Sequence, residues 1–116
     1  MNKKEKIVLG ISILLALFLA GFAGLGKLMG GEDVVALFTK GGIEDWRVII
    51  GVGQIVSAFL FAIPLTQRFG TWLLSSYFGG AIMLHMTINE SIMVPTLFLI
   101  IIWVLSILRK DVPIKV

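Results

Sequence analysis

The sequence has 116 residues, enough for one domain, and 58% of them are hydrophobic while 15% are charged. Soluble domains average roughly 45–50% apolar and about 25% charged residues, so a water-soluble fold of this size is excluded in favour of one placed in a bilayer. The absence of cysteine excludes disulfides and thiol chemistry, and the net charge of +3 is spread between apolar runs, with no basic stripe for nucleic acid.

Four long apolar runs, separated by short polar segments, make up most of the chain. An α-helix rises about 1.5 Å per residue, so about 20 apolar residues cross the ~30 Å hydrocarbon layer. Backbone amides in hydrocarbon must be hydrogen-bonded internally, which requires helices. The sequence therefore predicts an all-α polytopic membrane protein, a four-transmembrane-helix bundle that forms a single transmembrane domain over residues 1–116. The spans are expected at about 7–28, 46–65, 71–88 and 92–108.

The first run follows a short basic head, a pattern that also suits a cleaved signal peptide. Three further apolar runs follow it, so we expect it to remain attached as the first span. The next segment, 29–45, is the longest connection. It is expected to lie outside and to contain a short surface helix over 33–38, before Gly41 and Gly42 turn the chain back.

Proline and polar residues mark the remaining boundaries. The second run ends near Pro64, and the segment 66–70 is expected to form a tight turn. The fourth run carries Pro95 in its first turn, where the missing N–H is harmless. That run is expected to stop at the polar residues and proline that follow it, Arg109, Lys110, Asp111 and Pro113.

Basic residues are distributed unequally between the two sides of the predicted bundle. Three lie on the side of the long connection: Lys27, Lys40 and Arg47. Seven lie on the side shared by the head, the middle turn and the tail: Lys3, Lys4, Lys6, Arg68, Arg109, Lys110 and Lys115. Cytoplasmic loops are enriched in lysine and arginine, so we expect an inner-membrane protein with both termini in the cytoplasm.

Small residues predict where the spans pack, because helices in lipid associate through close contacts of small side chains. The fourth run has no small-residue seam and is expected to face lipid or to cover one side of the bundle. The positions expected at the interfaces are Ala16, Ala20, Gly24, Gly51, Ala58, Ala62 and the pairs Ser75/Gly79 and Ser76/Gly80.

Three polar side chains near the outer leaflet are the candidate ligand-binding residues: Lys27, Gln54 and His85. Ionisable groups at membrane depth are functional candidates because they need partners there. At ~100° per residue, Lys27 falls on the packing face of the first span and is expected to point inward. Trp46, an interfacial anchor by position, and Glu90 are secondary candidates.

Each candidate also has a purely structural interpretation. Lys27 can extend its charge to the interface, and Gln54 can be a hydrogen-bond latch between helices. His85 lies ~140° from Gly80 on a helical wheel, away from the middle of the small-residue seam, which favours a satisfied interface residue. Glu90 can simply be solvated.

Familiar catalytic and metal-binding arrangements are missing from the sequence. One histidine and no cysteine make a metal centre or two-histidine haem ligation implausible. No serine is set up with a histidine and an acid, and no glycine run is typical of phosphate binding. We therefore predict no catalytic residue, no metal ligand and no evident cofactor, and we do not favour an enzyme.

Four short segments follow one another in a familiar order. They are Ala23-Gly24-Leu25-Gly26-Lys27-Leu28, Phe38-Thr39-Lys40-Gly41-Gly42-Ile43 on to Trp46, Ile50-Gly51-Val52-Gly53-Gln54, and Gly79-Gly80-Ala81 before His85. Over about residues 20–90 the chain thereby resembles the DoxX-like family of small four-helix membrane proteins. The resemblance implies association with respiratory or redox partners, since relatives accompany quinone-linked oxidoreductases and oxidative-stress assemblies. Members often carry an acidic residue where Gln54 stands, a difference that argues against a proton-linked role there.

Three functions follow from these residues and this resemblance. The first is an accessory or redox-associated subunit that contacts a membrane oxidoreductase or receives a quinone-like head group. Lys27 would supply charge to that head group, and Gln54 and His85 would supply hydrogen bonds to its carbonyl oxygens. The second is a structural or assembly protein without a ligand site. The third is a small dimeric transporter, which the lack of an acidic residue in the first run disfavours. A homo-oligomer is compatible with all three.

Overall fold

The computed structural model describes residues 2–109, and this part of the chain is helical with no strand, which confirms the all-α prediction. The expected stop signals Lys110, Asp111 and Pro113 and the tail residue Lys115 lie outside the described residues. The helices are α1 (Lys3–Leu17), η1 (Phe18–Gly24), α2 (Leu25–Met29), α3 (Glu32–Lys40), η2 (Glu44–Trp46), α4 (Arg47–Ala62), η3 (Pro64–Thr66), α5 (Gln67–Thr87) and α6 (Met93–Arg109).

The segments α1, η1 and α2 form one continuous helix from Lys3 to Met29. It begins at Asn2, whose Oδ1 accepts a hydrogen bond from the N–H of Glu5 at 2.8 Å, as an N-cap does. It ends at Gly30, which has a φ of 70°. Glycine adopts this left-handed conformation at little energetic cost and therefore commonly ends helices. Its middle part, η1, is a π-helix, a wider turn that the sequence pattern did not reveal.

The connection between α4 and α5 is shorter than predicted. Helix α4 stops at Ala62 because Ile63 precedes a proline and adopts an extended conformation. Helix α5 already begins at Gln67, so the expected turn over 66–70 is wrong beyond Thr66. Gly70 lies in the first turn of α5, directly against the backbone of Phe61 in α4. The missing side chain at Gly70 is what lets the two helices approach there.

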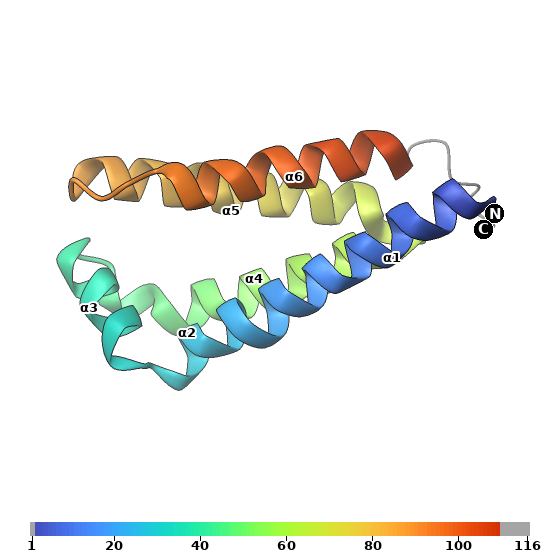
Figure 1. Cartoon of the computed structure of the whole chain (residues 1–116). Coiled ribbons are helices and arrows are strands. Elements are labelled where there is room, and N and C mark those ends of the chain that lie inside the picture. Colours follow the sequence, from blue (N-terminus) through green and yellow to red (C-terminus); the bar gives the residue numbers. More distant parts are fainter. Residues whose placement is uncertain (1, 110–116) are drawn as a thin grey trace.

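The helices are arranged as two pairs that diverge towards one end of the molecule (Figure 1). Helices α5 and α6 lie side by side, and α4 packs against the α1–α2 rod as well as against α5. Helix α1 meets α6 near the end that holds the start of α1 and the end of α6. Helix α3 lies across the opposite end, where the two pairs are furthest apart.

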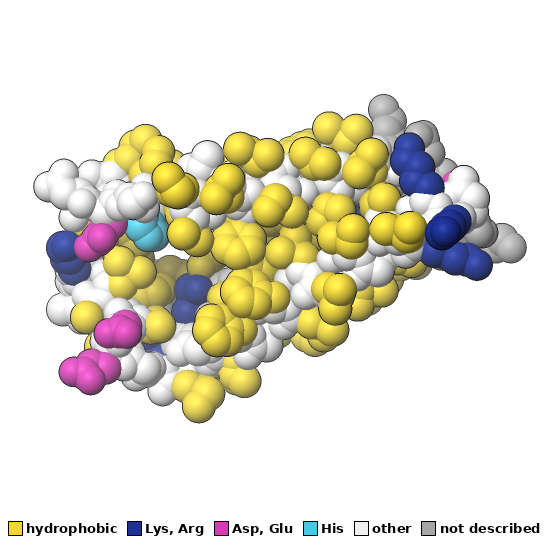
Figure 2. Space-filling view, viewed as in Figure 1, with side chains coloured by type: hydrophobic (Ala, Val, Ile, Leu, Met, Phe, Trp, Pro, Cys, Tyr) yellow, Lys and Arg dark blue, Asp and Glu magenta, His cyan; other side chains and the backbone are white. Residues whose placement is uncertain are grey.

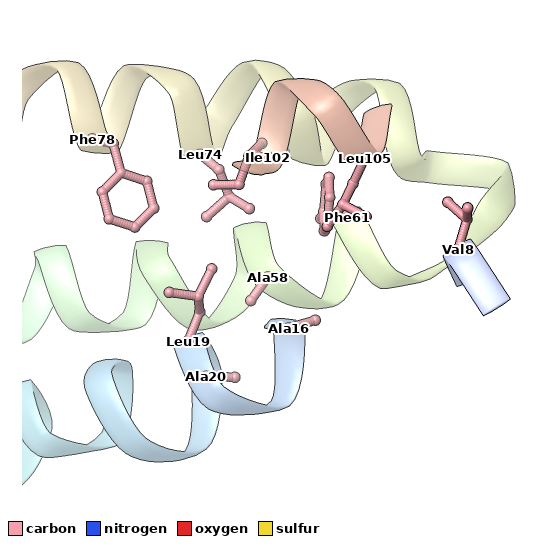
Figure 3. Packing of buried hydrophobic residues seen from close by; sticks show 10 residues of the cluster. All are labelled: Val8, Ala16, Leu19, Ala20, Ala58, Phe61, Leu74, Phe78, Ile102 and Leu105. Atoms are coloured by element: carbon pink, nitrogen blue, oxygen red, sulfur yellow. The ribbon is translucent and has the colours of Figure 1, made fainter. Parts of the chain in front are cut away.

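The apolar core lies between the two pairs and is built from all four long helices (Figure 3). The expected interface residues Ala16, Ala20 and Ala58 are buried in it. Its buried members are Val8, Ala16, Leu19, Ala20, Ala58, Phe61, Leu74, Phe78, Ile102 and Leu105.

The small-residue seam predicted on α5 is wrong. Ser76, Gly79 and Gly80 are exposed, and a Cβ added at either glycine would meet no heavy atom within 4 Å. The buried residues of α5 are instead Gly70, Thr71, Leu74 and Phe78. The pattern of small residues therefore identified the interfaces of α1 and α4 but selected the wrong face of α5.

Polar side chains join the helices at the end of the bundle opposite α3. Arg109 is 3% exposed and donates to the carbonyl oxygens of Phe61 at 2.6 Å and Ala62 at 3.2 Å. It thereby caps the C-terminus of α4, whose last carbonyls have no intrahelical partner. Between α5 and α6, Gln67 donates to Ser106 Oγ at 2.7 Å. These contacts close the bundle at the end opposite α3.

The exterior is apolar along most of its length (Figure 2). Large apolar side chains on α1, α4 and α6 are about half exposed, among them Leu14, Phe59 and Ile107. Within the described residues, two helices are long and apolar enough to cross a membrane, Lys3–Met29 and Glu44–Ala62, and Met93–Arg109 is apolar but shorter. Such a surface is unfavourable in water and suits contact with lipid.

Candidate functional site

A cavity of about 460 Å³ lies between the two helix pairs, in the half of the molecule that α3 covers. This volume is within the usual range for small-molecule sites. Figure 2 shows the hollow open to one side, with a basic side chain inside it and the histidine at its edge. Its residues come from η1, α2, α3, α4, α5 and α6 and from the connection between α3 and η2: Phe18, Leu19, Ala23, Lys27, Leu37, Phe38, Ile43, Ile50, Gln54, Ser76, Tyr77, Phe78, Gly80, Ala81, Leu84, His85, Val94, Pro95 and Phe98.

Lys27 reaches into this cavity from α2, as its position on the packing face predicted. Its Nζ lies 5.3 Å from the centre of the Tyr77 ring and 3.5 Å from the carbonyl oxygen of Ala23. Gly51 lets α4 approach the base of this side chain, because a Cβ at Gly51 would lie 3.0 Å from the Lys27 Cβ. The ammonium group therefore faces an aromatic ring inside the bundle rather than lipid.

Arg47 secures the end of the helix that carries Lys27. Its guanidinium donates to the carbonyl oxygen of Lys27 and, at 3.4 Å, to that of Leu28. The last carbonyls of α2 are thus satisfied by a cation from the start of α4. The sequence predicts only a contribution of Arg47 to topology, because no short-range pattern links it to Lys27.

Gln54 is the most buried polar residue of the cavity wall, with 1% of its surface exposed. Its Nε2 donates to the carbonyl oxygen of Leu19 at 3.1 Å, so the predicted latch between helices exists. Leu19 lies in the π-helix η1, whose i→i+5 hydrogen bonds widen the helix and which often marks functional sites. The amide is therefore held in one orientation by a carbonyl that lies in this π-helix.

The other half of the Gln54 amide is unused. Its Oε1 is buried and has no hydrogen-bond partner among residues 2–109. Leaving a buried acceptor unpaired costs about 1–3 kcal/mol. The oxygen cannot exchange places with Nε2, because a carbonyl oxygen would then face the carbonyl of Leu19. The wall of the cavity therefore contains an amide whose orientation is fixed and whose oxygen is unused.

His85 lines the same cavity as Lys27 and Gln54, although on a helical wheel it lies away from the middle of the predicted small-residue seam. Its Nδ1 lies 2.6 Å from the carbonyl oxygen of Ala81, one turn earlier in α5. A carbonyl only accepts hydrogen bonds, so Nδ1 carries a proton. In the neutral ring, Nε2 is then the free acceptor.

Aromatic rings form one wall of the cavity. Phe98 of α6 stacks on Phe18 of η1 with 5.8 Å between ring centres, and on Phe78 of α5 with 5.6 Å. The planes are nearly parallel, at 19° and 18°. Tyr77 stands next to Phe78 in an edge-to-face arrangement. This wall is not predictable from the sequence, because aromatic residues scattered over three runs carry no spacing signal.

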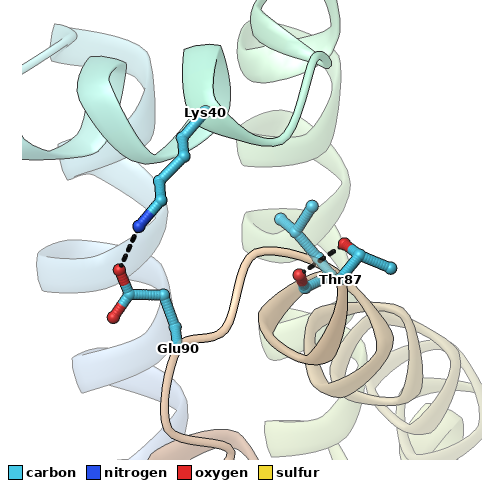
Figure 4. A network of polar contacts seen from close by, with 4 residues as sticks. Lys40, Thr87 and Glu90 are labelled. Atoms are coloured by element: carbon cyan, nitrogen blue, oxygen red, sulfur yellow. Dashed lines mark hydrogen bonds and ion pairs between the residues drawn. The ribbon is translucent and has the colours of Figure 1, made fainter.

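Helix α3 closes the end of the cavity. Leu37 and Phe38 face the cavity, and Phe38 is 4% exposed, so the expected surface helix also contributes to the core. Lys40, at the end of α3, forms an ion pair of 2.9 Å with Glu90 in the connection between α5 and α6 (Figure 4). The hydrogen bond and charge of Lys40 lower the pKa of Glu90, so the pair is ionised at neutral pH.

The two secondary candidates thus differ in position. Glu90 lies at the rim, where it is paired with Lys40 and is not simply solvated. Trp46 is 58% exposed on the outside of the bundle and is not among the residues that line the cavity. Its position suits an interfacial anchor rather than a ligand contact.

The arrangement is suited to binding. Apolar and aromatic walls surround three polar groups, Lys27, Gln54 and His85, which is the usual composition of a small-molecule site. Among residues 2–109, no group of three or more histidine or acidic side chains is placed to hold a metal ion.

Comparison with known proteins gives one match. A sequence model of the DoxX-like family matches residues 11–107, most of the chain. No curated protein and no solved structure matches the sequence.

Proposed function

Because the chain belongs to the DoxX-like family, we propose that it is a four-span inner-membrane protein that binds the head group of an amphiphilic molecule. The head group is of the quinone type and lies beside Lys27, Gln54 and His85. The protein serves as an accessory subunit of a membrane oxidoreductase. One observation carries the binding role: three polar groups from three helices converge on a single apolar cavity.

The position of the cavity supports a ligand that enters from the bilayer. Its open side lies between the diverging helix pairs (Figure 2), so a lipid tail can leave laterally while the head group stays inside. In the proposed topology the α3 end faces outward, which places the cavity in the outer half of the membrane. Of the basic residues, Lys3, Lys4, Lys6, Arg68 and Arg109 then lie at the cytoplasmic end.

Variants with a single cysteine test the four-span topology. The unmodified protein has no cysteine, so it gives no background labelling. The variants are Lys4→Cys, Glu44→Cys, Arg68→Cys and Ser91→Cys, all at exposed positions near helix ends. With a membrane-impermeant maleimide, we expect positions 44 and 91 to react in intact spheroplasts. Positions 4 and 68 are expected to react only after the membrane is opened. Labelling of positions 4 and 68 from opposite sides would contradict the topology.

The accessory role predicts a partner. Tagged protein extracted in mild detergent is expected to bring down an oxidoreductase in near-stoichiometric amount, together with quinone-reducing activity in the eluate. The same tag on an unrelated membrane protein of similar size is the control. If the protein elutes without a partner at matched expression, the accessory role is wrong, whereas the ligand site would remain open to the experiments below.

A further inference from the structure

Gln54 contributes an amide with an unused acceptor to the wall of the cavity. One hydrogen of its Nε2 is donated to Leu19 O at 3.1 Å. Its Oε1 is buried and unpaired among the described residues. A head group that only accepts hydrogen bonds, such as a carbonyl, would leave this oxygen unsatisfied. A hydroxyl would satisfy it.

His85 has the same preference when its ring is neutral. Since Nδ1 donates to Ala81 O, Nε2 is left as an acceptor. Gln54 and His85 therefore both call for a hydrogen-bond donor on the ligand. Lys27 and the Tyr77 hydroxyl can donate to the oxygen of such a group, and the Lys27 ammonium group already lies over the Tyr77 ring. This polarity differs from the sequence-based expectation that Gln54 and His85 donate to carbonyl oxygens.

The walls favour a flat ring on the ligand. The stack of Phe18, Phe98 and Phe78 lines the cavity together with Tyr77. Aromatic faces pack well against another ring. The open lateral side leaves room for an apolar tail.

We propose that the cavity selects amphiphiles with a phenol-type head group, whose hydroxyl donates to Gln54 Oε1, over molecules of the same shape that can only accept. The reduced, hydroxyl-bearing form of a quinone belongs to this class, and the oxidised form does not. The inference rests on the proposed function, since it specifies the head group that the same cavity holds.

Two probes of nearly equal shape test this selection: 4-decylphenol and its methyl ether, 4-decylanisole. Binding is measured by equilibrium dialysis against protein in nanodiscs, with empty nanodiscs correcting for partition into lipid. The phenol is expected to bind about tenfold more tightly or better, because sites built around a ligand hydroxyl reject analogues that lack it. The variant Gln54→Met keeps the length of the side chain and is expected to remove the preference.

The control is Ser57→Ala, a change at a buried position on the same helix that does not line the cavity. It is expected to keep the preference. If both probes bind equally, the cavity does not select phenols, although it still binds a ligand. If Gln54→Met keeps the preference for the phenol, Gln54 is not the residue that causes it. If nanodiscs with the protein bind no more of either probe than empty nanodiscs do, the cavity is not a ligand site. Should Gln54→Met fail to fold, the two probes on the unmodified protein still decide.

Discussion

Replacing Gly70 by alanine is expected to lower the free energy of unfolding by about 3 kcal/mol or more. A Cβ at this position would run into the backbone N and Cα of Phe61 and would lie 2.7 Å from the carbonyl carbon of Leu60. Backbone atoms cannot rotate away as a flexible side chain can. Helices α4 and α5 would have to separate, and the core around Phe61 and Leu74 would loosen.

The matched control is Gly79→Ala on the same helix, where an added Cβ meets open space. Both changes raise intrinsic helix propensity by about 1 kcal/mol, so the control is expected to be neutral or slightly stabilising. The measurement is the midpoint of thermal unfolding in detergent, which should fall by about 10 °C or more for Gly70→Ala alone. Equal midpoints for the two variants would show that α4 and α5 do not approach at Gly70.

The helices were predictable from the sequence because apolar runs bounded by proline and polar residues are long and unambiguous. The packing face of α1 was predictable as well. Ala16, Ala20 and Gly24 recur at one helical spacing, and Gly24 sits so close to Ile55 that a Cβ would come within 2.6 Å of it. A repeated spacing of small residues identifies the face of a helix that packs against its neighbours. For Ala16, Ala20 and Gly24 this spacing was sufficient to identify the buried face.

The face of α5 was not predictable in this way. Ser75/Gly79 and Ser76/Gly80 have the expected spacing, whereas Gly70 stands next to residues typical of a turn. Small residues allow a close contact, but the partner helix decides which of them is used. This error also explains the placement of His85. Its angle was judged from Gly80, whereas the buried face of α5 follows Phe78, and His85 lies two turns further along on that side.

The candidate site was predictable in its members but not in its chemistry. Lys27 and Gln54 stood out because polar groups are rare at membrane depth. The orientation of the Gln54 amide depends on the carbonyl of Leu19 in the π-helix, a tertiary contact between residues 35 positions apart. The capping roles of Arg47 and Arg109 are likewise contacts between distant segments. Charge counting could not distinguish such residues from topological charges.

Replacing Gly80 by phenylalanine is expected to fill part of the cavity and so to exclude a bound ligand. Gly80 lines the cavity, and a Cβ there meets no heavy atom within 4 Å, so a ring can enter without displacing the backbone. A bound molecule would then be crowded at a cost of about 1.4 kcal/mol or more, which corresponds to at least about tenfold weaker binding. Gly79→Phe is the control, because Gly79 is exposed and does not line the cavity. Both variants are expected to fold.

Native mass spectrometry of the protein released from its own membrane tests the ligand site most directly. The unmodified protein and Gly79→Phe are expected to carry a small amphiphile as a defined added mass. Gly80→Phe is expected to carry it at a tenth of that occupancy or less. If the unmodified protein is detected without any added mass, or if Gly80→Phe retains the same adduct at the same occupancy, the cavity between the two helix pairs is not a binding site.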